Sequence, residues 1–127
     1  MLNEKFYITL GTAKLLKDYG YNEDTDYVIF GDSNIVRNDY SLTNKYLPQE
    51  YGENYSCPTI FEVVDYLEQV YGFIVETNVL EPNKYTFIIG QYNNNKVNFI
   101  HTDYTFNNRF IALESGVVYV LKNLLKK

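Results

Sequence analysis

One stretch limits the possible folds of this chain more than any other: residues 56–76, SCPTIFEVVDYLEQVYGFIVE. Thr59 followed by Glu62 is the capping-box pattern that begins many helices, and Gly72 suits the left-handed position that ends them. The residues between them repeat apolar side chains at spacings of three and four, which predicts an amphipathic helix: Ile60, Val63, Val64, Leu67, Val70 and Tyr71. The β-rich run FIVET follows at once and predicts a strand.

The remaining chain alternates between helical and β-rich patterns. Residues 9–19 predict a first helix that ends at Gly20, and DYVIFGDSNIVRNDY predicts a hairpin around its turn-forming GDSN. FIVET, KYTFIIGQY and VNFIHTDY predict a three-strand meander with a tight turn at NNNK. The last segment, FNNRFIALESGVVYVLKNLLKK, predicts a helix capped by Asn107 or Asn108, with a strand over GVVYV as the alternative. Gly116 in that helix would allow a close approach to the sheet.

These elements predict an α+β fold and one globular domain over residues 1–127. In it, an antiparallel sheet, made of the hairpin plus the three-strand meander, has about three helices packed on one face. Residues 38–58 form a polar, tyrosine-rich loop, and loops of this length are often functional. No signal peptide or membrane-spanning run is evident, and a single cysteine forms no internal disulfide, so we expect a cytoplasmic protein with no membrane contact.

The charge distribution bears on the kind of partner. The chain has a net charge of −5, and residues 1–66 hold 11 acidic against 5 basic side chains. Nucleic-acid binders usually carry a basic stripe, so this balance disfavours direct nucleic-acid binding. Asp24, Asp26 and Asp32 are instead candidate contacts for a basic partner. The alternative is that the acidic side chains only keep the domain soluble.

Tyrosine is the second compositional signal. The chain has 14 tyrosines and no tryptophan. Because tyrosine provides a large contact area at a low entropy cost, Tyr46, Tyr51 and Tyr55 in the polar loop are candidate partner-binding residues. Codon bias in an AT-rich genome is the alternative explanation for the tyrosines.

Only weak signals point to catalysis. Cys57 precedes a helix start, where a thiol pKa can be lowered, but a nucleophilic cysteine needs a positioned base. His101 is the only histidine, and Asp103 two residues later could orient it. Cys57 and His101 are therefore weak candidate reactive residues. Asp24 and Asp26 fail the calcium-loop pattern, and phosphate-loop, dinucleotide and serine-hydrolase motifs do not occur. We predict no catalytic residue, metal or cofactor, and favour a protein that is not an enzyme.

Three segments carry a family resemblance: TLGTAKLLKDYGY, SCPTIFEVVDYLEQVYGFIVE and FIALESGVVYVLKNL. Their order resembles that of small uncharacterised proteins encoded by phages and mobile elements of Bacteroides-type gut bacteria. The departures are Tyr66, where the family often has tryptophan, and Cys57, where alanine commonly precedes the Pro-Thr pair. The resemblance implies a phage or mobile-element context and no particular activity.

Three hypotheses follow for the function. The first is a non-enzymatic accessory protein that binds another protein, and one form of this role is inhibition of a host factor. The second is a self-assembling structural component, such as a homodimer formed through aromatic residues of segment 84–104 on the sheet face without helices. The third is a small enzyme or ligand-binding domain built on Cys57 and His101.

Overall fold

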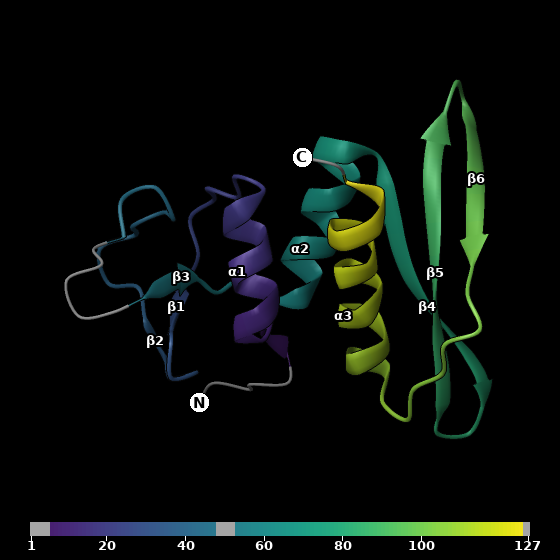
Figure 1. Ribbon diagram of the computed structural model, residues 1–127, viewed down its shortest axis with the longest axis horizontal. Helices are drawn as coiled ribbons and strands as arrows, with labels where there is room; N and C mark the ends of the chain where they lie inside the picture. Colours follow the sequence, from purple (N-terminus) through teal and green to yellow (C-terminus); the bar gives the residue numbers. More distant parts are fainter. Residues whose placement is uncertain (1–5, 48–52, 126–127) are drawn as a thin grey trace. The chain divides into compact units, whose positions relative to one another are not determined.

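The computed structural model describes residues 6–47 and 53–125, which divide into two compact units (Figure 1). Unit 1 contains residues up to Thr59, and unit 2 begins at Ile60. Each unit combines helix with a three-stranded antiparallel sheet, so the α+β class is confirmed. The hairpin and the meander belong to separate sheets, one in each unit. The single globular domain stays a prediction.

Unit 1 consists of helix α1 (Leu10–Asp18) and strands β1 (Tyr27–Phe30), β2 (Ile35–Arg37) and β3 (Asn54–Ser56). The strand order is β2-β1-β3, and both pairings are antiparallel. The expected hairpin is β1–β2. Strand β3 was not predicted from the sequence, because it lies in the segment 38–58 that was expected to be an irregular loop. Three residues are too few for the alternation of apolar and polar side chains that marks a strand.

Helix α1 ends as its sequence predicts. Gly20 has a φ of 85°, which is the left-handed conformation. The Tyr21 amide donates to the Leu16 carbonyl at 2.9 Å, and the Gly20 amide donates to the Lys17 carbonyl at 3.0 Å. This pair of hydrogen bonds is a Schellman motif. It turns the chain so that Tyr21 is buried next to the last turn of the helix.

Unit 2 begins with α2 (Ile60–Tyr66) and the π-helical segment η2 (Leu67–Tyr71), which ends at Gly72 with a φ of 75°. Strands β4 (Phe73–Glu81), β5 (Lys84–Asn93) and β6 (Lys96–His101) form the predicted meander in the order β4-β5-β6. Asn94 and Asn95 have φ values of 49° and 67°, as a two-residue hairpin turn requires. The expected loop NVLEPN is mostly strand, since β4 continues to Glu81.

The chain of unit 2 closes with α3 (Arg109–Tyr119) and the π-helical segment η3 (Val120–Leu124). The helix prediction is therefore confirmed and the strand alternative over GVVYV is wrong. Asn108 is the cap, because its Oδ1 accepts from the amides of Phe110 and Ile111 at 2.8 and 3.1 Å. A Cβ added at Gly116 would lie 2.7 Å from Val75 Cγ1, so this glycine lets α3 approach the sheet closely.

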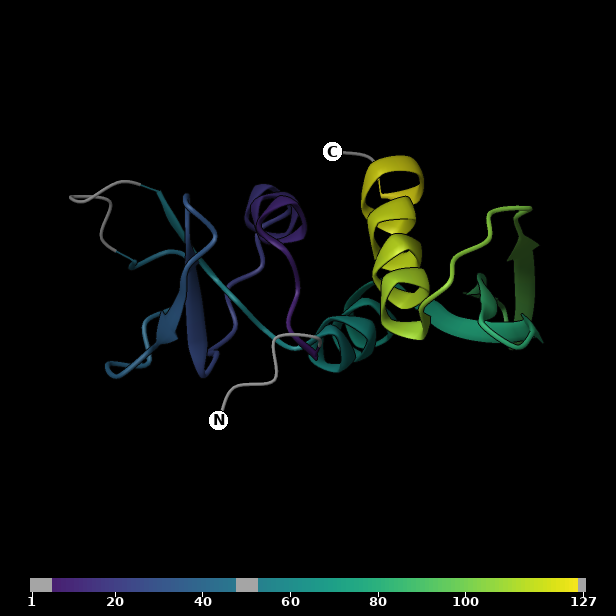
Figure 2. The same cartoon turned by 90° about the horizontal axis from the view of Figure 1, so that it is seen from below.

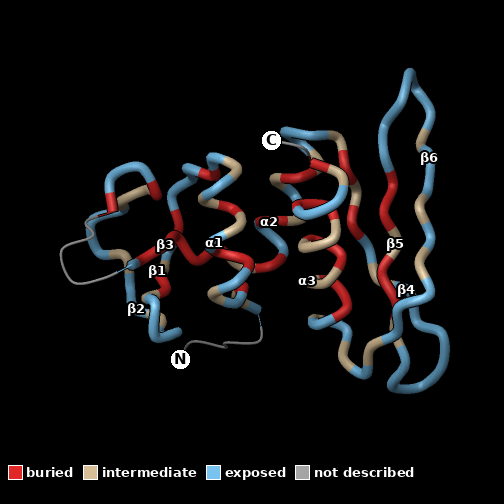
Figure 3. The backbone as a smooth tube through the Cα atoms, viewed as in Figure 1, coloured by how far each residue is buried: buried red, intermediate tan, exposed pale blue. Residues whose placement is uncertain are grey.

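Both units bury apolar side chains between helix and sheet, while the outer end of the β5–β6 hairpin is exposed (Figure 3). In unit 2, α3 packs on one face of the sheet (Figure 2). No helix among the described residues is both long enough and apolar enough to span a membrane.

Candidate interaction site

The sheet of unit 1 carries apolar side chains on both faces. Ile29 and Tyr55 are direct neighbours across β1 and β3, and they share the face that packs toward α1, where Lys17 lies over the Tyr55 ring. Because side chains alternate along a strand, Val28 and Phe30 project from the opposite face. Val36 is the direct partner of Val28 across β1 and β2 and lies on that face as well. Among the described residues of unit 1, no helix lies over this face.

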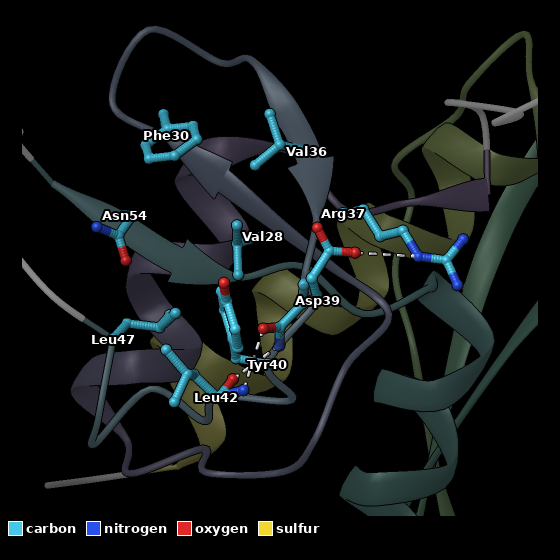
Figure 4. Close-up of a pocket in the computed structure, with 10 residues that line it drawn as sticks. Val28, Phe30, Val36, Arg37, Asp39, Tyr40, Leu42, Leu47 and Asn54 are labelled. Atoms are coloured by element: carbon cyan, nitrogen blue, oxygen red, sulfur yellow. Dashed lines mark hydrogen bonds and ion pairs between the residues drawn. The ribbon is translucent and has the colours of Figure 1, made fainter.

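The loop after β2 supplies a second wall, and a groove of about 240 Å³ lies between the loop and the strands. We call it the unit 1 groove (Figure 4). Leu42 and Leu47 come from the loop, and Tyr40, also from the loop, is 85% exposed. The complete lining is Val28, Phe30, Val36, Arg37, Asn38, Asp39, Tyr40, Leu42, Leu47 and Asn54.

Asn38 fixes the start of this loop. Its Nδ2 donates to the carbonyl oxygens of Thr25 and Leu42, at 2.9 and 2.8 Å. Its Oδ1 accepts from the Leu42 amide at 3.0 Å. The side chain therefore closes a turn over residues 38–42 and ties that turn to the segment before β1. Leu42 is held in this way at the groove.

Asn44 fixes the next part of the loop. It is 5% exposed, its Nδ2 donates to the Tyr21 carbonyl and its Oδ1 accepts from the Ser56 amide, both at 2.8 Å. One side chain thus joins the loop to the segment after α1 and to β3. Since buried amides are costly without partners, these two bonds hold the loop in one position.

A polar hollow of about 400 Å³ adjoins the groove and shares Arg37, Asn38 and Asp39 with it. Asp24 and Asp26 also line this acidic hollow. Arg37 Nε lies 3.4 Å from Asp39 Oδ1, and both side chains are well exposed, so their ion pair contributes little to stability. Within the described part of the chain, neither Asp24 nor Asp26 has a basic partner, and the hollow carries a negative net charge.

The structure separates the acidic residues that the sequence singled out. Asp24 and Asp26 lie together in the acidic hollow. Asp32 lies in the β1–β2 turn instead, where its carboxylate accepts from the Asn34 amide at 3.0 Å and from the Asn34 Nδ2 at 2.8 Å. Asp32 therefore acts mainly in the hairpin turn.

The candidate tyrosines are also separated. Tyr46 is 65% exposed and lies beside Lys45, outside the lining of the groove. Tyr55 is only 8% exposed, so it offers little area to a partner. Burial raises the pKa of the Tyr55 hydroxyl, and hydrogen bonding to the Glu53 carboxylate raises it further. Tyr51 lies outside the described residues.

The two weak reactive candidates lie in different units and in different environments. Cys57 is fully buried, and its thiol donates to the Ile8 carbonyl at 3.7 Å. A reactive thiol is normally accessible, so this environment fits a packing role. His101 is exposed at the end of β6, in unit 2. No group of three or more possible metal ligands occurs among residues 6–47 and 53–125.

Sequence reasoning missed Val36, Tyr40 and Leu42. A signal for the groove was present in YVIF at β1, where neighbouring residues are all apolar. A strand with a single buried face would alternate with polar residues. The run therefore indicated a second apolar face, while the loop that makes that face a groove depends on contacts distant in sequence.

Neither the protein-family models, nor the curated proteins, nor the solved structures include a match to this chain. The resemblance to phage and mobile-element proteins therefore stays a prediction.

Proposed function

We propose that the chain is a protein-binding module. The unit 1 groove would take an apolar side chain of another protein, and the acidic hollow would take a basic side chain close to it. The single observation behind this proposal is that an open apolar groove and a negatively charged hollow share a wall of Arg37, Asn38 and Asp39.

The apolar part of this surface favours a protein partner. Binding grooves for peptides are lined by apolar and aromatic side chains and use a few polar groups for orientation. Tyr40 and Val36 are 85% and 40% exposed, so a partner would remove apolar area from water by covering them. Tyrosine at the rim also resembles the composition of known interfaces.

The charged part selects the chemistry of the partner. Asp24 and Asp26 repel phosphate groups and attract lysine and arginine, which supports a basic protein segment as the occupant. Rim charges of this kind mainly increase the association rate and exclude wrong partners. In the phage or mobile-element context that the resemblance implies, the target would be a basic surface on a host protein, met in the cytoplasm, and binding would inhibit that protein.

The apolar part is tested by substitution. The tagged full chain would capture proteins from a host-type lysate, alongside Val36→Glu and a matched control, Val79→Glu. Val79 is an exposed strand valine of unit 2, with 51% exposure against 40% for Val36. We expect one stoichiometric partner with the unchanged chain and with Val79→Glu, and none with Val36→Glu. Equal capture by all three proteins would contradict the groove, and circular dichroism would verify that each is folded.

The acidic hollow is tested by charge reversal. Asp24→Lys combined with Asp26→Lys should weaken capture strongly, whereas two reversals outside the hollow, Asp32→Lys and Glu53→Lys, carry the same change in net charge. Equal loss in both double variants would show that net charge acts alone. Binding that survives reversal of all three aspartates would remove the electrostatic part of the proposal.

Self-assembly is the second candidate function, and an observation in unit 2 supports it. Tyr92 and Phe99 are 53% and 57% exposed on the sheet face opposite α3, and Phe99 packs over Gly90. In the described ladder β6 pairs only with β5, so its outer edge is open. A second copy would supply the same edge, because antiparallel pairing is self-complementary about a two-fold axis. A monomer by light scattering at high concentration would remove this candidate.

A further inference from the structure

Strand β2 lies at an edge of the unit 1 sheet, and its outer side is open. The Asn38 amide donates to the Asp26 carbonyl at 2.8 Å, so the backbone groups of Asn38 point toward β1. Because these groups alternate in direction along a strand, those of Ile35 and Arg37 point away from β1. In the ladder that the structure describes, β2 pairs with β1 alone. The amides and carbonyls of Ile35 and Arg37 therefore face outward without a neighbouring strand.

The opposite edge of this sheet, at β3, is already occupied. There the outward amide of Ser56 donates to Asn44 Oδ1 at 2.8 Å, so an asparagine side chain stands where the carbonyl of a further strand would lie. Within the described part of the chain, no side chain bonds to the backbone of Ile35 or Arg37 in this way. An open strand edge is a template for pairing with another chain. In unit 1, β2 is thus the edge at which a partner can extend the sheet.

Both cavities of the candidate site adjoin this edge. Val36 points to one face of the sheet, where it is 40% exposed and lines the unit 1 groove (Figure 4). Tyr27 and Arg37 are direct partners on the other face, and both line the acidic hollow. A strand added beside β2 would place alternate side chains on the two faces. Its successive side chains would therefore reach the groove and the hollow in turn.

The chemistry of the two cavities specifies the sequence of such a strand. The groove favours apolar side chains, and Asp24 and Asp26 favour basic ones. Arg37 is paired with Asp39, so it leaves the charge of the other two aspartates uncompensated. Both strand pairs of this sheet are antiparallel, which is also the slightly more stable arrangement.

We propose that the partner binds as an extended segment of another protein, added antiparallel to β2, in which apolar and basic residues alternate. This inference rests on the protein-binding function proposed above. It adds the backbone geometry of the bound segment and the pattern of its sequence.

The test uses the full-length chain and two synthetic peptides of equal composition with blocked ends: Val-Lys-Val-Lys-Val-Lys and Val-Val-Val-Lys-Lys-Lys. Backbone amide shifts would be followed by NMR during titration with each peptide. We expect the alternating peptide to shift the Ile35 and Arg37 amides in a saturable way, and the block peptide to bind at least about tenfold more weakly. Absence of saturable binding by the alternating peptide would overturn the proposal.

Methyl groups on the peptide backbone test the hydrogen bonds without changing the protein. In an antiparallel addition, the peptide residues that bond to Ile35 and Arg37 have their side chains on the same face as these two residues, so they are the lysines. N-methylation of the lysine amides should therefore abolish binding, whereas N-methylation of the valine amides should change the affinity by less than about threefold. Equal effects, or the reverse order, would overturn this alignment.

A proline variant tests the same edge from the side of the protein. Ile35→Pro removes an outward amide and no hydrogen bond to β1, so the sheet should still form, as circular dichroism would verify. It should weaken binding of the alternating peptide by at least about tenfold. Val97→Pro is the matched control, because the Asn94–Asn95 turn directs the Val97 amide to the open edge of β6. Equal affinity in the two variants would overturn strand addition.

Two further variants separate this inference from the proposed function. Peptide binding could be lost in Val36→Glu and in the combined Asp24→Lys and Asp26→Lys variant, yet be kept in Ile35→Pro and after N-methylation. That result would overturn the added strand and leave the protein-binding function in place. Binding that persists in Val36→Glu and in the double aspartate variant would instead contradict the groove and the hollow, and with them the proposed function.

Discussion

Unit 1 and unit 2 use the same parts, helix and three-stranded sheet, but different means of support. The strands of unit 1 have 4, 3 and 3 residues, whereas those of unit 2 have 9, 10 and 6. Short strands make few ladder hydrogen bonds, and in unit 1 buried or partly buried side-chain amides such as Asn38 and Asn44 bond to the backbone in their place. Unit 2 is stabilised by the many hydrogen bonds of its long strands and by the apolar side chains buried between α3 and the sheet. We infer that hydrogen bonds from side-chain amides support the small sheet of unit 1 in place of a long ladder.

The largest expected effect tests whether the two units are separate cooperative structures. Leu16 of α1 and Leu121 of η3 are both fully buried. Replacing either with alanine should cost about 2–5 kcal/mol of unfolding free energy, since each leaves a cavity. We expect hydrogen exchange to lose protection in unit 1 for Leu16→Ala and in unit 2 for Leu121→Ala. Alkylation of the buried Cys57 should accelerate in the first variant alone.

Equal loss of protection in both units, with either variant, would break the comparison. It would instead support one cooperative domain over the whole chain. Denaturation followed by two probes, far-ultraviolet circular dichroism and Cys57 alkylation, gives an independent measurement of the same question.

The second effect concerns the amides themselves. Asn44→Ala removes the side-chain partner of the Tyr21 carbonyl and that of the Ser56 amide, and should cost about 1–3 kcal/mol. Asn98 on β6 is exposed, and Asn98→Ala should change stability by less than about 0.5 kcal/mol. Chemical denaturation measures both. A similarly small change in stability at the two positions would mean that the hydrogen bonds of the Asn44 side chain do not support unit 1.

The third effect compares two helical glycines. A Cβ at Gly116 would meet Val75 and Phe87 at 2.7 and 3.0 Å, so Gly116→Ala should destabilise unit 2 by about 1–3 kcal/mol despite a better helix propensity. Gly11 of α1 has no atom within 4 Å of that position. Gly11→Ala should therefore stabilise unit 1, by up to about 1 kcal/mol. Thermal unfolding that shows the same sign for both would refute the close approach of α3.

The smallest effect is a pH dependence that arises from Tyr55 in unit 1. Burial, followed by the neighbouring Glu53, raises the pKa of Tyr55 above its ordinary value of 10.0. The folded state then holds this proton more tightly than the unfolded state does. The stabilisation is complete below the unfolded pKa and is lost as pH rises through the folded pKa. Tyrosinate absorbance should show one late-titrating tyrosine that disappears in Tyr55→Phe, and its persistence there would reassign the group.

The sequence predicted unit 2 better than unit 1, for a physical reason. The meander, the Asn94–Asn95 turn and the Asn108 cap depend on neighbouring residues, so their patterns are visible along the chain. Strand β3 and the groove depend on contacts between distant segments, such as Asn44 with Tyr21 and Ser56. A three-residue strand carries no periodic signal of its own.

The candidate site shows the same division. Asp24 and Asp26 were recognisable because acidic residues crowd in NEDTD. Composition could not show that Tyr55 turns inward beneath Lys17, or that Asp32 bonds within its own turn. Whether a tyrosine is a contact or a core residue is decided by the face of the strand it occupies, and one step in register reverses that face.

The hydrogen bonds of Asn38 and Asn44 also have a kinetic meaning for the unit 1 groove. A loop that must be ordered during association loses conformational entropy at that moment, and its partner encounters many shapes that cannot bind. Here the wall that carries Leu42 is already bonded to the backbone at both asparagines. Binding would therefore be a rigid-body association with a preformed groove, and its rate would be governed by diffusion and charge. The backbone of the groove would differ little between the free and the bound state.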